Sequence, residues 1–167
     1  MVESSRDRVT IARAGRGFEL TATQWVPQPV DRVFAFFADP LNLERITPPF
    51  LRFHVRRRST PDVREGTRFT YTLQLHGVPV LWRTRIEEWQ SPHRFVDVQL
   101  LGPYAAWRHT HRFATDGNGT KLEDEVRYRL RCSALQDTPL LAWVHRDVQE
   151  IFRYRQRAIR SELGGPA

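Results

Sequence analysis

The sequence predicts an α+β domain in which a curved antiparallel sheet wraps around one long helix at the end of the chain. Two observations carry this prediction. Residues 50–131 alternate apolar and polar side chains with period two, which indicates consecutive antiparallel strands. Residues 139–163 repeat their apolar side chains with the helical period, which indicates an amphipathic helix. A sheet with one apolar face needs a cover, and this helix is long enough to provide it.

Before the strand-rich region, the sequence predicts one strand and two short helices. Residues 18–26 alternate well enough to form a strand that Pro27 ends. A helix is expected to follow around residues 30–37. A second helix begins at Asp39-Pro40, where an N-cap is followed by proline at the first helical position. Residues 1–17 are polar at their start, and we expect them to form a flexible segment.

Turn signals divide residues 50–131 into six strands, which makes seven with the first one. His76-Gly77 and Ser91-Pro92 are typical of tight turns, and Asp116-Gly117-Asn118-Gly119 is a strong hairpin signal. The strands are expected near residues 51–56, 68–75, 78–89, 94–101, 104–115 and 120–131. The result is a continuous antiparallel meander with two short helices between its first and second strands.

The predicted C-terminal helix has start and stop signals and one charged residue within its apolar face. Thr138 can act as N-cap with Pro139 at the first helical position, and Gly164-Gly165-Pro166 can end the helix. Arg155 falls within the apolar stripe. An unpaired buried charge is costly, so Arg155 must reach solvent, pair with a buried acid or meet a ligand. The stripe consists of Leu141, Val144, Val148, Ile151, Phe152 and Ile159.

Composition indicates one domain, expected at residues 18–163 with a tail at 164–167. The chain has 167 residues and a net charge of +7, but only Arg56-Arg57-Arg58 forms a basic run, and alternation places the strand aromatics inside. We therefore expect no specific nucleic-acid binding. The single cysteine, Cys132, fits a reducing compartment, and no stretch approaches the length of a membrane span, which favours a cytoplasmic protein. Composition leaves the oligomeric state open.

Several polar side chains fall on the inward face of the predicted sheet. The alternation that points Trp107 and Phe113 inward places His109 and His111 beside them. Asp124 lies among the inward residues of the last strand. Residues 94–101 are ambiguous: the inward set contains either Val96, Val98 and Leu100 or Phe95, Asp97 and Gln99.

These inward polar groups leave several roles open. They can form a hydrogen-bonded network that only specifies packing, in which Asp124 pairs with Arg155 or a histidine. They can also line a cavity and orient the polar head of an apolar ligand. His109 and His111 with Asp124 or Asp97 have the chemistry of metal ligands, but His-x-His alone is a weak signal, so no metal and no cofactor are predicted. A His-Asp pair can act as a general base, although no nucleophile motif accompanies it.

A set of short motifs accompanies this order of elements across residues 18–163. They are Phe34, Phe36-Phe37, Asp39-Pro40, Asn42-Leu43, Ile46-Thr47-Pro48-Pro49, Gly77-Val78-Pro79, Trp82, Phe95-Val96-Asp97, Gln99, Gly102-Pro103-Tyr104, Trp107, His109, His111, Phe113, Ile151-Phe152 and Tyr154-Arg155. Together with the order of elements, they resemble the ligand-binding branch of the SRPBCC (START-like) superfamily, in particular the bacterial polyketide cyclase/dehydrase-like subgroup.

This resemblance implies a helix-grip fold with a hydrophobic cavity between the sheet and the C-terminal helix. It also implies that Asp97 and Gln99 face inward. The expected function is binding of a hydrophobic or aromatic small molecule, lipid or polyketide-like, with a polar head. The expected wall is Tyr71, Trp82, Trp107, Phe113, Val148 and Phe152, and the expected polar groups are Asp97, Gln99, His109, His111, Asp124 and Arg155.

Two other functions compete with ligand binding. The first is an enzyme of the cyclase, dehydratase or aromatase kind, with His109, His111 and Asp124 as candidate catalytic residues. The second is a protein-partner module that binds no small molecule. A binding protein without catalysis is the preferred interpretation, because no fold-level likeness fixes a reaction.

Overall fold

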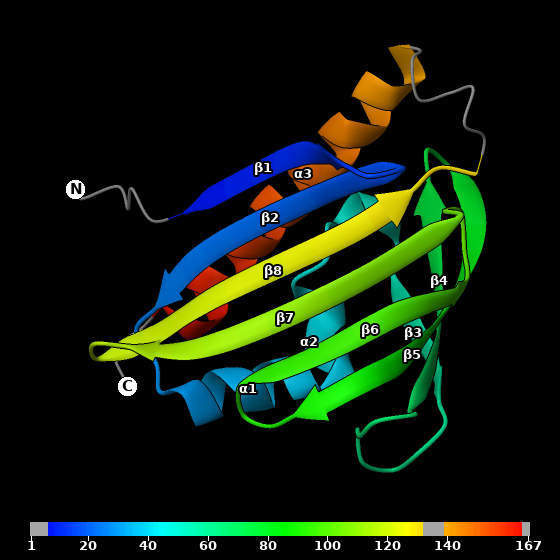
Figure 1. The fold of residues 1–167 in the computed structure, drawn as a ribbon. Helices are drawn as coiled ribbons and strands as arrows, with labels where there is room; N and C mark the ends of the chain where they lie inside the picture. The colour runs from blue at the N-terminus through cyan, green and yellow to red at the C-terminus, as the bar shows by residue number, and fades with distance from the viewer. Residues whose placement is uncertain (1–6, 132–138, 165–167) are drawn as a thin grey trace.

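The computed structural model describes residues 7–131 and 139–164. A long sheet curves around helix α3, and helices α1 and α2 close one end of the space between them (Figure 1). The elements are β1 (Arg8–Ala14), β2 (Gly17–Val26), α1 (Val30–Ala38), α2 (Pro40–Arg45), a 3-10 turn η1 (Pro49–Leu51), β3 (His54–Arg58), β4 (Arg68–Leu75), β5 (Val78–Gln90), β6 (Arg94–Leu101), β7 (Ala106–Asp116), β8 (Gly119–Arg129) and α3 (Pro139–Leu163).

The sheet has eight antiparallel strands in the order β1-β2-β8-β7-β6-β5-β4-β3. Strands β3 to β8 form the predicted meander, and β2 pairs with β8, so the first predicted strand lies beside the last. The helix-grip architecture predicted from the sequence is therefore confirmed. No helix in the described ranges combines the length and apolarity that crossing a bilayer requires.

The N-terminal segment corrects the predicted strand count of seven. Part of the stretch that was expected to be flexible, Arg8–Ala14, is the edge strand β1, joined to β2 by a turn with Gly15 at φ +56. Only Val9 and Ile11 of this strand pack against the core. The strand is otherwise held by backbone pairing with β2 and by a hydrogen bond from Gln156 Nε2 of α3 to the Arg8 carbonyl. Backbone contacts of this kind produce no apolar pattern in the sequence.

The start of β3 also differs from the prediction. Residues 49–51 form the 3-10 turn η1, and Arg52 after it adopts a left-handed conformation with φ 43, so the strand begins at His54. Pro48 and Pro49 explain the difference, because the fixed φ of proline favours such a turn. The predicted N-cap Thr138, the cysteine Cys132 and the end of the predicted stop signal at 165–166 lie outside the described residues.

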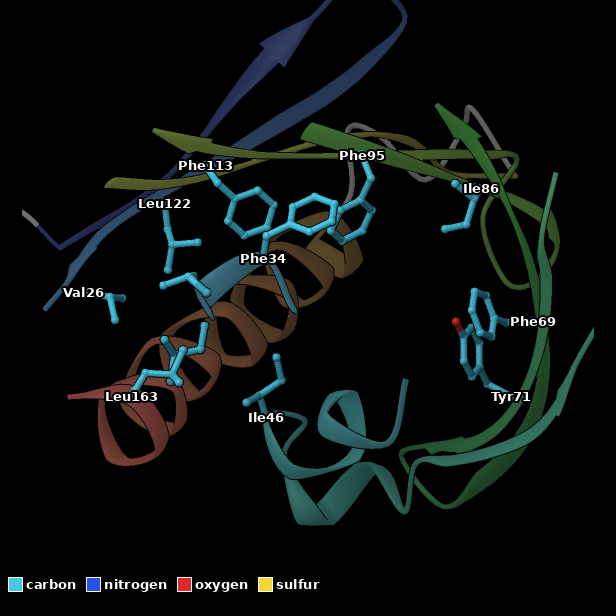
Figure 2. Packing of buried hydrophobic residues seen from close by; sticks show 12 residues of the cluster. Val26, Phe34, Ile46, Phe69, Tyr71, Ile86, Phe95, Phe113, Leu122 and Leu163 are labelled. Carbon is cyan, nitrogen blue, oxygen red and sulfur yellow. The ribbon is translucent and has the colours of Figure 1, made fainter. Parts of the chain in front are cut away.

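Two apolar clusters hold α3 against the sheet. One contains Phe34, Phe95 and Phe113 and reaches the C-terminal turns of α3 through Ile159 and Leu163. Figure 2 shows these side chains directed inward from α1, the sheet and α3, with Phe69 and Tyr71 together on β4. The other cluster lies around β2 and β8 and takes in the middle of α3. Its buried members are Phe18, Leu20, Ala22, Val126, Tyr128, Val148 and Phe152.

Candidate functional site

An internal cavity of about 180 Å³ lies between the two clusters. Its wall is mainly aromatic and aliphatic, with side chains from the sheet, α1, α2 and α3. Its polar lining is small and comes from the sheet, from α3 and from the connection after α2: Thr84, Asp97, His109, His111, Arg155 and Thr47. The aromatic lining is Phe36, Phe37, Phe53, Phe69, Tyr71, Trp82, Trp89, Phe95, Tyr104, Trp107 and Phe152.

Strand register brings four predicted polar residues together on the inner face of the sheet. Asp97 of β6 lies directly opposite His109 of β7, and His111 of β7 lies directly opposite Asp124 of β8. Residues opposite each other in antiparallel strands share a face, and their diagonal neighbours are also within reach. The inward orientation of Asp97, which the resemblance implied, is confirmed by its contacts with both histidines.

These four residues form a compact buried group, called here the His-Asp quartet. Asp124 Oδ1 lies 2.9 Å from His109 Nε2 and 2.7 Å from His111 Nδ1. Asp97 Oδ2 lies 3.3 Å from His111 Nε2 and 3.8 Å from His109 Nδ1. The imidazole ring centroids are 3.7 Å apart. Side-chain exposure is only 6% and 7% for the histidines and 13% and 19% for Asp124 and Asp97, so water screens these charges little.

The quartet holds its two histidines in different charge states. Burial, together with the nearby charge of His111, lowers the pKa of His109 to about 4. Burial also opposes charge on His111, but the charge and hydrogen bond of Asp124 raise the pKa of His111 above its ordinary value. Burial alone would raise the pKa of Asp124; the charge of His111 and the hydrogen bond from His109 keep it well below its usual range. A neutral His109 beside a protonated His111 is therefore favoured.

Arg155 enters the cavity from α3 without an acidic partner. The residue is 9% exposed, and its Nε and Nη1 atoms are buried with no hydrogen-bond acceptor among the described residues. Its guanidinium carbon lies 5.1 Å from the ring centre of Phe152, one helical turn earlier. The predicted alternative of an Asp124–Arg155 pair is thus wrong, because Asp124 is taken up by the two histidines.

The remaining predicted site residues divide into two groups. Tyr71, Trp82, Trp107, Val148 and Phe152 line the cavity as predicted. Gln99, Phe113 and Asp124 are not among the lining residues. Phe113 belongs to the core beside α1. Gln99 donates through Nε2 to the Tyr104 carbonyl at 2.9 Å, and its side chain packs where a Cβ on Gly102 would clash.

Sequence reasoning missed three residues of the wall, two from α1 and one from β5. Phe36 and Phe37 line the cavity from the last turns of α1, and Thr84 lines it from β5. Phe36 and Phe37 stand among the quoted motifs, but their helical spacing suggested only core packing. Thr84 lies beside Tyr71, whose hydroxyl pKa is raised by burial. The alternation of β5 predicts that Thr84 faces inward, but a short hydroxyl side chain gives no sign by itself of a place in a cavity wall.

Comparison with known proteins agrees with this geometry. A family model described as polyketide cyclase / dehydrase and lipid transport matches residues 17–163. The chain belongs to this family. Its description covers both catalysis and transport and is consistent with a fold that binds hydrophobic ligands. Among curated proteins, none matches the chain.

Solved structures of similar fold come from bacteria and plants. Protein Ms6760 from Mycobacterium smegmatis shares 20% identity at a TM-score of 0.64, covering 93% of this chain and 99% of that one. TTHA0849 from Thermus thermophilus shares 22% at 0.66, covering 87% and 96%. Ginseng major latex-like protein 151 from Panax ginseng shares 12% at 0.66, covering 89% and 99%. At these identities the likeness shows the fold and leaves the ligand undetermined.

Proposed function

We propose that this member of the family binds an apolar small molecule with an acidic head group in the cavity, and that Arg155 pairs with that head group. The observation that carries the proposal is a buried guanidinium on the cavity wall with two nitrogens that lack an acceptor. An unpaired buried charge costs several kcal/mol in general. A ligand carboxylate or similar anion would remove this cost and accept two parallel hydrogen bonds from the guanidinium.

The rest of the wall supports an apolar or aromatic body for the ligand. Trp82 and Trp107 meet edge to face at 5.4 Å, and Tyr104 lies 4.8 Å from Trp107. Such flat rings provide a large contact area for an aliphatic or aromatic body. The geometry therefore favours an amphipathic acid over a compact polar metabolite, whose hydroxyl groups would face these rings unpaired.

The test compares two fluorescent probes that share an apolar body and differ in charge. 8-Anilinonaphthalene-1-sulfonate is anionic, and N-phenyl-1-naphthylamine is neutral; both brighten in apolar surroundings. Arg155→Gln is expected to weaken binding of the anionic probe by about tenfold or more, because a charge-assisted hydrogen bond contributes about 1.5–3 kcal/mol. Binding of the neutral probe is expected to stay within about twofold of the wild type.

Two further variants complete the experiment. Arg155→Lys keeps the charge and is expected to retain part of the preference for the anionic probe. Arg157→Gln removes an exposed arginine of the same helix, whose guanidinium lies over Tyr154, and is expected to change neither affinity. If Arg155→Gln weakened binding of both probes equally, or of neither, the proposal would be wrong. A lower melting temperature in that variant would then show that Arg155 is a structural residue.

A further inference from the structure

The His-Asp quartet places two imidazole rings between two carboxylates. His109 Nε2 lies 2.9 Å from Asp124 Oδ1 and can donate to it. His111 Nδ1 lies 2.7 Å from the same oxygen. Each ring therefore turns one nitrogen toward Asp124 and has its other nitrogen, His109 Nδ1 or His111 Nε2, for a second partner.

The other two ring nitrogens face Asp97. His111 Nε2 lies 3.3 Å and His109 Nδ1 lies 3.8 Å from Asp97 Oδ2. Three atoms that can each ligate a metal ion therefore surround one small volume at the cavity wall.

We propose that Asp97, His109 and His111 bind a divalent transition-metal ion of the zinc class. Imidazole nitrogen and carboxylate oxygen are the ligands such ions prefer, and two histidines with one carboxylate are a common set for them. The three ligand atoms lie within 4.8 Å of one another, and this is the one such group of three among residues 7–131 and 139–164.

The two nitrogen–oxygen separations at the site are close to those on such an ion. Zinc lies about 2.0–2.1 Å from imidazole nitrogen, so two ligand atoms on one tetrahedral ion are roughly 3.3–3.5 Å apart. The separation of 3.3 Å between His111 Nε2 and Asp97 Oδ2 meets this value. The separation of 3.8 Å between His109 Nδ1 and Asp97 Oδ2 must shorten by a few tenths of an ångström. All three residues line the cavity, which leaves room for a further ligand on the ion.

Asp124 supports the site by contacting the two ring nitrogens that do not face Asp97. Histidines that bind metals usually donate their other N–H to a carboxylate, which fixes the ring orientation and raises the basicity of the ligating nitrogen. Asp124 serves both histidines in this way from one oxygen atom. The charges of Asp97 and Asp124 together balance a divalent ion, so the loaded site buries no net charge.

The site also differs from the other histidine–acid contacts of the described chain. His76 with Asp147, and His54 with Glu44, each contain one histidine, and their histidine side chains are 48% and 57% exposed. A single exposed histidine and one carboxylate hold a metal weakly. They serve as controls for nonspecific binding.

The experiment measures Zn²⁺ binding to the full-length chain after treatment with a chelator, by calorimetry and native mass spectrometry. We expect one ion per chain. Asp97→Asn, which keeps the shape and removes the charge, and Asp124→Asn, which removes the support for both imidazoles, should each weaken binding by about tenfold to a hundredfold. Cobalt(II) is expected to produce a visible absorption band in the wild type that Asp97→Asn changes or abolishes.

Control variants separate this site from accidental ones. His76→Ala and Cys132→Ser are expected to leave Zn²⁺ affinity unchanged. Zn²⁺ binding is measured without either fluorescent probe, so the result is independent of the test of the ligand proposed above. Absence of a one-to-one complex, wild-type affinity in both Asp97→Asn and His111→Ala, or loss of binding in His76→Ala or Cys132→Ser would overturn the assignment. Thermal melts check that each variant is folded. If His111→Ala does not fold, wild-type affinity in Asp97→Asn alone would overturn the assignment.

Discussion

Strand β7 carries ionic contacts on both of its faces, and the two faces treat them differently. On the outer face, Arg108 lies 2.9 Å from Glu87 and 2.8 Å from Glu88, and Arg112 lies 3.2 Å from Glu123. These arginine side chains are 37% and 39% exposed. On the inner face, the histidines of the quartet make contacts of similar length while almost wholly buried.

This difference shows which charged residues of the molecule indicate function. Outer pairs are screened by water and contribute about 0–1 kcal/mol each, so their number says little about function. Inner pairs must overcome a large desolvation cost, and apolar side chains of similar volume would often be as stable or more stable. Stability alone therefore does not explain the quartet and Arg155. Arg155 and three members of the quartet line one cavity, where the proposed ligands would offset the desolvation cost.

The largest expected effect comes from breaking the inner group. Asp124→Ala in chelator-treated protein should lower the free energy of unfolding by about 3 kcal/mol, because two buried imidazoles lose their shared acceptor. Glu123→Ala, on the same strand but facing outward, is the matched control and should cost less than about 1 kcal/mol. Urea denaturation of both variants measures the difference. Equal losses would show that the two faces are energetically alike.

A smaller effect is expected from breaking the outer pairs. Arg108→Ala removes contacts with Glu87 and Glu88 but exposes both carboxylates to water, so the free energy of unfolding should fall by less than about 1 kcal/mol. This small loss should shrink further at 1 M salt, where the screening length is about 3 Å. A loss near that of Asp124→Ala that persists in salt would contradict the comparison.

The sequence predicts the fold well because periodicity reports directly on burial. Alternation placed His109 and His111 inside, and helical spacing placed Arg155 in the apolar stripe; the structure confirms these positions. Alternation did not decide the orientation of Asp97, because apolar residues occur on both faces of β6, and Phe95 and Val96 are in fact both buried. Only the resemblance to a family settled that orientation.

The pairing of the quartet was beyond the reach of sequence patterns for another reason. Whether Asp124 contacts Arg155 or the histidines depends on the β7–β8 register and on the angle at which α3 crosses the sheet. The residues of a single segment determine neither of these. Strand β1 escaped prediction in a similar way. Its partner is supplied by a hairpin at Gly15, and its side chains, apart from Val9 and Ile11, remain at the surface.

The smallest expected effect concerns a third kind of histidine, one without an acidic partner in the described part of the chain. His145 on α3 packs edge-on against Phe18 at 4.5 Å and near Tyr128, and its Nε2 is buried with no hydrogen-bond partner among residues 7–131 and 139–164. Burial lowers the pKa of His145 below its ordinary 6.5. Below about pH 6.5, the unfolded chain therefore binds a proton that the folded chain resists. Stability should fall as pH falls from 6.5 toward the folded pKa, and should be unaffected by this group above about pH 7.5.

The variant His145→Phe isolates this contribution. Its free energy of unfolding should drop less than that of the wild type between about pH 7.5 and about pH 5.5, by less than ~0.5 kcal/mol because solvent screens this half-buried site. Acid effects from His109 and His111 cancel in the difference between the two proteins. Guanidinium denaturation at both pH values measures it. If the variant lost more stability on acidification than the wild type, His145 would be held by an acidic partner, and the contrast between paired and unpaired buried imidazoles would fail.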